Sequence, residues 1–336
     1  MTEVRQPGTG ARPRRGGGDP PHDGGDRPPH GSGDGAPQDS SAGRLLGIDI
    51  GGTKIALAVS TMDGMVLATD VLPTGADEGA EAILTRLAAA GHRLLAGSGG
   101  SVVAVGAVGP GIVRPDGVAL SPNISGWHRV RLADEIATRF GTARVAVDND
   151  VKAAGLAELR HGALRGTDPG LFVSLGTGVA AAITVGGRVL VGAHGAAGEF
   201  GYDLRTPDEP RAAADGYSPL ERAVGGRGVA ERAAAVLGEP VTAGQLFART
   251  DAAARQLAAE VLAELAMHVA NLCIAIDPRR VAVGGGLTGI GAPLFDALRA
   301  RLDAAVPFPP ELVPARFRTD GALHGALALA TDAHRS

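Results

Sequence analysis

The sequence predicts an α/β protein of two related lobes, each with a mixed sheet flanked by helices, with a cleft between them. Apolar strand-like segments alternate with segments of helical periodicity along the chain. Two glycine turns, at residues 51–52 and 176–178, are each flanked by apolar strands and lie about half a chain apart. The length of 336 residues exceeds one typical domain and is about enough for two.

The first lobe is expected over residues 44–150. Its first three strands form a meander, and a crossover helix leads to each later strand. The expected elements are strands at 45–50, 55–60 and 65–73, a helix at 78–96, a strand-like stretch at 102–113 that ends in a Gly-Pro-Gly turn, a helix at 132–141 and a strand at 144–150 that ends in acids.

The second lobe is expected over residues 151–336 and repeats this plan, with a last helix that can return to the first lobe. The two glycines at 186–187 signal a hairpin. The expected elements are a helix at 151–162, strands at 171–175 and 179–185, a short strand at 188–192, a long helix at 252–276, a strand at 280–286 and a helix at 293–305.

Residues 1–43 are dominated by Gly, Pro, Arg, Asp and Ser. Such a segment cannot bury enough apolar surface to offset its ordering entropy, so we expect a disordered tail. The arginines at 12, 14 and 15 could contact an acidic partner, but a solvated tail without a partner is the simpler interpretation.

Charge and composition exclude several classes of protein. The net charge of −4 gives no basic field that would attract nucleic acid or an anionic membrane. No uninterrupted run of about 18 apolar residues occurs and the N-terminus lacks a signal-peptide pattern, so a cytoplasmic protein is expected. The one cysteine, Cys273, rules out an intramolecular disulfide and a zinc site built on several thiolates.

The stretch DIGGTK (49–54) ends one apolar strand and begins another. Gly51 and Gly52 let the main chain approach an anion, and Thr53 and Lys54 add a donor and a positive charge for phosphate oxygens. Asp49 would repel a phosphate unless a divalent cation lies between them, and Mg²⁺ binds a carboxylate together with phosphates. The alternative is a plain hairpin turn with a capping aspartate.

Two later glycine clusters extend this pattern. Gly176-Thr177-Gly178 repeats the turn, so the two turns could hold a polyphosphate from both sides of one cleft. Gly284-Gly285-Gly286 ends another strand and could pass close to a base or ribose. Three such strand ends in a two-lobed α/β pattern indicate a nucleotide site.

The acids of VDND (147–150) close an apolar strand and precede a helix. A carboxylate there faces the crevice where α/β proteins bind ligands, so Asp150 is a candidate general base for phosphoryl transfer and Asn149 a candidate polyol contact. Alternatively, Asp148 or Asp150 only caps the following helix. Glu199 and Glu221 lie among small residues and could bind vicinal hydroxyls, although each could equally be a surface acid.

Taken together, these segments resemble the ROK family of sugar kinases, within the actin-like ATPase and hexokinase superfamily. The resemblance covers about residues 44–332 and depends on six motifs in the family's order: DIGGTK, SPNISGW (121–127), VDND, SLGTGV (174–179), GAHGAAGEFG (192–201) and VAVGGGL (281–287).

The resemblance implies two actin-like ATPase (ribonuclease H-like) lobes, commonly as a homodimer, that use ATP and Mg²⁺, with Asp49 toward the metal. It implies that Asp150 deprotonates a primary hydroxyl of a small-molecule sugar. By position it also implies that the sugar is contacted by Asn123, Asn149, Glu199, Glu221 and the backbone of Gly111.

Three departures from the family pattern qualify these implications. Tyr202 replaces the histidine that contacts the anomeric end of the sugar in the family. The segment before Glu221 lacks the family's zinc-binding cysteines, so no zinc is expected. Alanines at 180–182 replace glycines after the second turn, which is itself kept.

The acceptor therefore stays open among glucose, N-acetylated hexosamines, fructose and a C7-cyclitol with an exocyclic hydroxymethyl group. A ROK-type transcriptional repressor is disfavoured, because residues 1–43 are too rich in Gly and Pro for a helix-turn-helix. A sugar-binding protein without catalysis is disfavoured because Asp49, Thr53 and Asp150 are all present.

Overall fold

The structure is a computed structural model that describes residues 42–121, 124–209 and 217–336. The tail predicted over 1–43 lies outside the described residues except for Ala42 and Gly43. Gly43 already begins the first strand, where it pairs with Ser101, because the parallel ladder extends one residue further than the apolar run. The first strand therefore begins one residue before the predicted start of the first lobe.

The first sheet has the strand order β3-β2-β1-β4-β7. Its strands are β1 (Gly43–Ile50), β2 (Lys54–Ser60), β3 (Val66–Pro73), β4 (Ser101–Gly109) and β7 (Val145–Asn149). The first three form the predicted antiparallel meander, and β4 and β7 run parallel to β1. Parallel neighbours require crossovers, which α1 (Ala80–Gly97) and α2 (Leu132–Phe140) contribute.

The second sheet repeats this topology with the order β10-β9-β8-β11-β12. Its strands are β8 (Gly170–Leu175), β9 (Val179–Val185), β10 (Arg188–Val189), β11 (Arg280–Gly284) and β12 (Glu311–Pro314). Between β10 and β11 lie α4 (Pro219–Val224), α5 (Gly226–Leu237), α6 (Ala243–Ala248) and α7 (Ala252–Ile276), and α8 (Ala292–Ala305) precedes β12. The predicted α/β class, with a mixed sheet in each of two related lobes, is confirmed.

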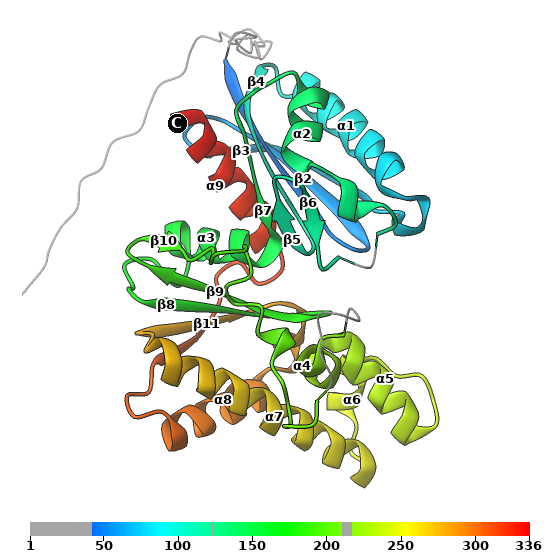
Figure 1. The fold of residues 1–336 in the computed structure, drawn as a ribbon, viewed down its shortest axis with the longest axis vertical. Helices are drawn as coiled ribbons and strands as arrows, with labels where there is room; N and C mark the ends of the chain where they lie inside the picture. Colours follow the sequence, from blue (N-terminus) through cyan, green and yellow to red (C-terminus); the bar gives the residue numbers. More distant parts are fainter. Residues whose placement is uncertain (1–41, 122–123, 210–216) are drawn as a thin grey trace, which may run out of the picture. The chain divides into compact units, whose positions relative to one another are not determined.

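Two helices lie between the sheets (Figure 1). The last helix, α9 (Gly321–Arg335), packs on β1 and β4 of the first sheet, whereas α3 (Asp150–His161) packs on β8 and β9 of the second. The two helices also pack on each other. This arrangement joins the lobes and brings the start of α3, with its acids, to the boundary between them.

Glycines allow these layers to approach closely. A Cβ at Gly106 of β4 would lie 1.8 Å from the carbonyl oxygen of Ala326 on α9. A Cβ at Gly325 of α9 would lie 2.0 Å from the carbonyl oxygen of Ala153 on α3. Backbone therefore packs against backbone at both contacts, which leaves no room for any side chain.

Within the strand-like stretch predicted over 102–113, strand β4 stops at the Gly-Pro-Gly turn, as expected. It ends at Gly109, because Pro110 has no backbone N–H and Gly111 has a φ of +87°. Ile112–Arg114 instead forms β5, which pairs with β6 (Gly117–Ala119) in a separate hairpin. The described residues also contain short 3₁₀ turns: η1 (Ala76–Glu78), η2 (Trp127–Arg129), η3 (Phe200–Tyr202) and η5 (Gly286–Ile290).

Helix α7 is long and apolar enough, by length and composition alone, to cross a membrane. Its buried residues, which include Val261, Leu265 and Val269, belong to the core of the second lobe. This packing is that of a core helix in a globular domain.

The close contact between α9 and α3 leads to a stability prediction. Replacing a helical glycine with alanine usually stabilises a protein by up to about 1 kcal/mol. At Gly325 the added methyl group overlaps the Ala153 carbonyl, so Gly325→Ala should instead lower the free energy of unfolding by about 2 kcal/mol. Gly97→Ala, at the end of α1, is the matched control, because a Cβ placed there would meet nothing within 4 Å. Urea unfolding of both variants tests the packing, and a Gly325→Ala protein as stable as Gly97→Ala would contradict it.

Candidate active site

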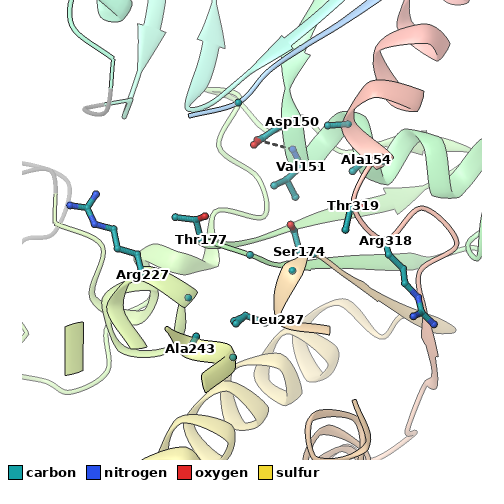
Figure 2. A pocket seen from close by; sticks show the side chains of 18 of the residues that line it. Asp150, Val151, Ala154, Ser174, Thr177, Arg227, Ala243, Leu287, Arg318 and Thr319 are labelled. Carbon is teal, nitrogen blue, oxygen red and sulfur yellow. Dashed lines mark hydrogen bonds between the residues drawn. The ribbon is translucent and has the colours of Figure 1, made fainter. Parts of the chain in front are cut away.

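One pocket of about 840 Å³ is lined by residues of both lobes. The three glycine clusters singled out in the sequence converge on it. The predicted residues that line the pocket are Asp49, Gly51, Lys54, Asp150, Gly176, Thr177, Gly285 and Gly286. Figure 2 shows Asp150 on one side of the pocket, with Thr177 and Ser174 facing it from the second sheet.

The first turn, between β1 and β2, is closed by its own backbone. The N–H of Gly51 donates to the carbonyl of Lys54 at 2.9 Å, and a Cβ on Gly51 would lie equally close to that carbonyl. Thr74, fully buried, donates its hydroxyl to the Gly51 carbonyl at 2.6 Å and its N–H to the Thr53 carbonyl at 3.0 Å. The turn is thus held in place by Thr74, the residue directly after β3, which the sequence analysis did not single out. Gly52 and Thr53 belong to the turn but do not line the pocket.

The second turn, between β8 and β9, is supported by the start of α5. The N–H groups of Gly226 and Arg227 donate to the carbonyls of Gly176 and Thr177, at 2.9 and 3.1 Å. Gly178 lies behind the turn, where a Cβ would be 2.1 Å from Oε2 of Glu221. Arg227 and Gly226 both line the pocket, although the sequence analysis assigned them no role.

The three glycines of the third cluster have three different roles. A Cβ on Gly284 would strike the Phe172 ring at 2.9 Å, and one on Gly285, whose φ is +91°, would lie 2.3 Å from the Leu175 carbonyl. Nothing lies within 4 Å of the corresponding position at Gly286, which is open to the pocket. Only the last two glycines line the pocket, whereas Gly284 serves strand packing.

Asn149, rather than either aspartate, caps α3. Its side-chain oxygen accepts the Lys152 N–H at 2.7 Å. Asp148 accepts the N–H of Asn149 instead, and Asp150 accepts the N–H of Val151, at 2.9 Å. The carboxylate of Asp150 therefore faces the pocket and does not cap the helix (Figure 2).

Asp49 and Asp150 carry charge that the protein compensates only in part. Burial raises the pKa of Asp49 to about 7, the Asp150 carboxylate adds to this increase, and Lys54 opposes it. Burial also raises the pKa of Asp150, against hydrogen bonds from backbone N–H groups. A divalent cation at Asp49 would compensate both the burial and the Asp150 charge that raise its pKa, so this carboxylate fits the predicted Mg²⁺ ligand.

The remaining predicted residues that the structure describes do not line the pocket. Glu199 accepts a hydrogen bond from the Asn149 side-chain amide at 2.9 Å, so the two residues are in contact. Glu221 accepts from the Val179 N–H at 3.2 Å and from the Ser218 hydroxyl at 3.2 Å. Gly111 forms the turn before β5, where a Cβ would lie 2.5 Å from the Ala119 carbonyl, and Asn123 lies outside the described residues.

Tyr202 lies close to the two glutamates. Burial raises the pKa of its phenol, and the charges of Glu221 and Glu199 raise it further. The segment that follows is fastened to α7, because Asp203 pairs with His268 at 3.0 Å and Arg205 pairs with Glu264.

Within the described residues no group of three or more His, Cys, Asp or Glu side chains could hold a metal ion.

Several pocket residues were missed in the sequence. Arg318 and Phe317 come from the loop before α9, and their position is fixed by buried Glu158, which accepts the Phe317 N–H at 2.7 Å. Thr242 and Gln245 lie at the start of α6, where they form a capping box. The T-x-x-Q pattern of that box was a recognisable signal, whereas nothing local marks the residues before α9.

The pKa of Asp49 leads to a prediction about stability and pH. Because the folded pKa lies above the ordinary value of 3.8, the folded state binds more protons than the unfolded state between about pH 4 and 7. The free energy of unfolding of the nucleotide-free protein therefore falls as pH rises through this window, and Asp49→Asn removes that loss. The variant should exceed wild type by roughly 2 kcal/mol at pH 8 and by much less at pH 5. Asp296→Asn, at an exposed position of α8, is the control, and an Asp49→Asn advantage equal at both pH values would refute the assignment.

Comparisons of the sequence and of the structure with known proteins all point to one family. The ROK family model matches residues 45–333. The N-acetylmannosamine kinase of Escherichia coli O9:H4 is 34% identical over 295 residues, which cover 85% of this chain and 97% of that protein. The ROK hexokinase of Thermus thermophilus superposes with a TM-score of 0.73 at 31% identity, over 85% of this chain and 97% of that one.

A ROK family glucokinase from Streptomyces griseus, solved in complex with glucose and AMPPNP, superposes with a TM-score of 0.71 at 30% identity. This match covers 86% of the present chain and 99% of that one. The predicted fold of two actin-like ATPase lobes is thereby confirmed. The chain belongs to the ROK family.

Proposed function

We propose that this chain is an ATP-dependent kinase that phosphorylates the primary hydroxyl of a hexose or hexose-like polyol. The observation that carries the proposal is the convergence of the three glycine clusters and the Asp150 carboxylate on one pocket (Figure 2). Backbone N–H groups suit an anionic donor, and a carboxylate across from them suits an alcohol that must lose its proton. The kinases among the relatives support the same reaction class.

In this proposal the nucleotide binds along the glycine clusters. Its phosphates lie against the turns at Gly51 and Gly176, with Lys54 and Thr177 as additional donors. Its adenosine lies toward Gly285 and Gly286, where Leu287 and the start of α6 form an apolar wall. The AMPPNP in the Streptomyces griseus structure supports an adenine nucleotide as the donor.

Asp150 acts as the general base. It accepts the proton of the primary hydroxyl while that oxygen forms its bond to the γ-phosphorus and the bond from the phosphorus to the bridging oxygen breaks. ADP leaves, and the proton passes from Asp150 to solvent. The raised pKa of Asp150 makes it a stronger base than an ordinary aspartate, which suits this role.

Asp49 would hold Mg²⁺, which would supply positive charge to neutralise the phosphates. The partly compensated negative charge around Asp49 supports this assignment. Lys54 contributes a second positive charge on the same side of the pocket.

We infer that the acceptor binds beside Asp150, where Glu199 is hydrogen-bonded to Asn149 and the charge of Glu221 acts on both Asp150 and Glu199. Glucose, N-acetylated hexosamines and fructose all present a primary hydroxyl and vicinal hydroxyls that carboxylates can bind. A C7-cyclitol does so as well, and it lacks the anomeric centre that the family's histidine contacts, which favours it where Tyr202 stands. A panel of these acceptors in a coupled ADP-release assay selects among them, and an enzyme that phosphorylates none of them would refute the kinase assignment.

Asp150→Asn tests the proposed base. The amide cannot take a proton, so kcat should fall by about 10²- to 10⁴-fold. Binding of the non-hydrolysable analogue AMPPNP should change less than about threefold, because that ligand needs no base. The neighbouring Asp148→Asn is the control, since Asp148 does not line the pocket. A turnover of Asp150→Asn near that of wild type would remove Asp150 from the mechanism.

Metal removal tests the proposed dependence on Mg²⁺ and independence from zinc. EDTA should abolish activity, and added Mg²⁺ should restore it. A zinc-selective chelator such as 1,10-phenanthroline should change neither activity nor the melting temperature, because the segment 203–205 is fastened by ion pairs. Elemental analysis that finds one zinc per chain would contradict this interpretation of the missing cysteines.

A further inference from the structure

Lys152 is a buried cation that the proposed reaction does not yet use. Its side chain on α3 is 1% exposed, and its Nζ has no hydrogen-bond partner among the described residues. The nearest carboxylate oxygen with which it pairs is Oε1 of Glu199, at 3.7 Å, which is an ion pair longer than a hydrogen bond. A buried ammonium is costly unless it is compensated, so its presence requires an explanation.

The position of Lys152 makes this cost larger. It lies in the first turn of α3, where the helix dipole already places positive charge. Helix stability therefore does not account for a cation at this site. Only nearby carboxylates can stabilise it, and its charge acts on the acids Glu199, Asp148 and Asp150.

The composition of the chain marks the same residue. The sequence has 32 lysines and arginines, and only two of these are lysines: Lys54, which lines the nucleotide pocket, and Lys152. A lysine has a compact charge on a flexible stem, whereas the planar guanidinium of arginine needs several acceptors in its plane. The two places where this chain uses lysine are thus both at the proposed active site.

The contacts of Glu199 indicate what Lys152 does. Oε1 of Glu199 accepts the Asn149 amide at 2.9 Å and faces Lys152, so one oxygen is held from two sides by the start of α3. Among the hydrogen bonds of the described residues, Oε2 takes part in none, and the Glu199 side chain is 21% exposed. One carboxylate oxygen is thereby fixed to the protein while the other stays available.

We propose that Lys152 is a positioning residue of the acceptor site: its buried ammonium holds Glu199 ionised and in place, so that Oε2 accepts hydrogen bonds from vicinal hydroxyls of the acceptor. This proposal rests on the proposed kinase function. Since Lys152 is covered, it acts through Glu199 and does not touch the acceptor. Its loss should therefore affect the acceptor and spare the nucleotide.

A kinetic double-mutant cycle tests this role on the acceptor that the panel identifies. Lys152→Met removes the charge at similar length and should raise the KM for the acceptor about tenfold or more, while the KM for ATP changes less than about twofold. In a Glu199→Gln background the same substitution should have less than a third of that effect, because the group through which Lys152 acts is gone. Equal effects in both backgrounds would reduce Lys152 to a structural residue and overturn the proposal.

A spectroscopic measurement tests the pair without any turnover. Protein labelled with ¹³C at the lysine Cε should give two lysine signals, and Lys54→Arg assigns them. Glu199→Gln should move the Lys152 signal and leave that of Lys54 unchanged, whereas the control Glu135→Gln on the surface of α2 should move neither. A Lys152 signal indifferent to Glu199→Gln would overturn the proposal even in an active enzyme. A wild-type protein inactive on the whole panel would instead refute the kinase function, whatever the spectrum shows.

Discussion

The constraint on which this site depends is electrostatic: a polyphosphate has to lie beside carboxylates that the reaction and its metal require. Burial, and after it the Asp150 carboxylate, already raise the pKa of Asp49 to about 7 before any phosphate is bound, and burial raises the pKa of Asp150 as well. Bringing in several more negative charges is possible only if positive charge is distributed around them. In the proposed complex, this positive charge would come from backbone N–H groups of the turns, from the Lys54 ammonium and from a cation held by Asp49.

The repeated fold brings the glycine turns and the carboxylates together at one pocket. Each sheet begins with an antiparallel meander whose first turn is rich in glycine, and the two helices between the sheets bring those turns into the same pocket. Neighbouring residues at the start of α3 then have different roles. Asn149 caps the helix, so Asp150 is left free for the pocket, and Lys152 turns inward to the acceptor side. Backbone contact at Gly325 leaves this helix little freedom to shift relative to α9.

The sequence predicted those parts of the site that are local. The turns at 51–54 and 176–178 are recognisable because strand, turn and following element are contiguous along the chain. The same holds for Asp150, which directly follows β7, and all three segments line the pocket. What could not be predicted are contacts between distant segments. Glu199 meets Asn149 and Lys152 from about 50 positions away, and Glu158 holds the loop at Phe317 across 159 positions. The expected role of Asn149 as a polyol contact stays a prediction, and most of its hydrogen-bonding capacity serves the helix cap and Glu199.

The proposed acceptor end of the site has a neutral phenol beside carboxylates, whereas the proposed nucleotide end has glycine turns and a lysine. Tyr202 lies near two glutamates whose charges raise the pKa of its phenol, so it stays neutral and can donate a hydrogen bond throughout the physiological range. A histidine at this place would change its charge near neutral pH. The residues after Tyr202 are held to α7 by Asp203–His268 and Arg205–Glu264, so the orientation of this end depends on ion pairs between a loop and a helix. If the acceptor binds as proposed, its far end would meet a neutral phenol beside carboxylates, an arrangement that suits hydroxyl groups on a ring and does not require an anomeric oxygen.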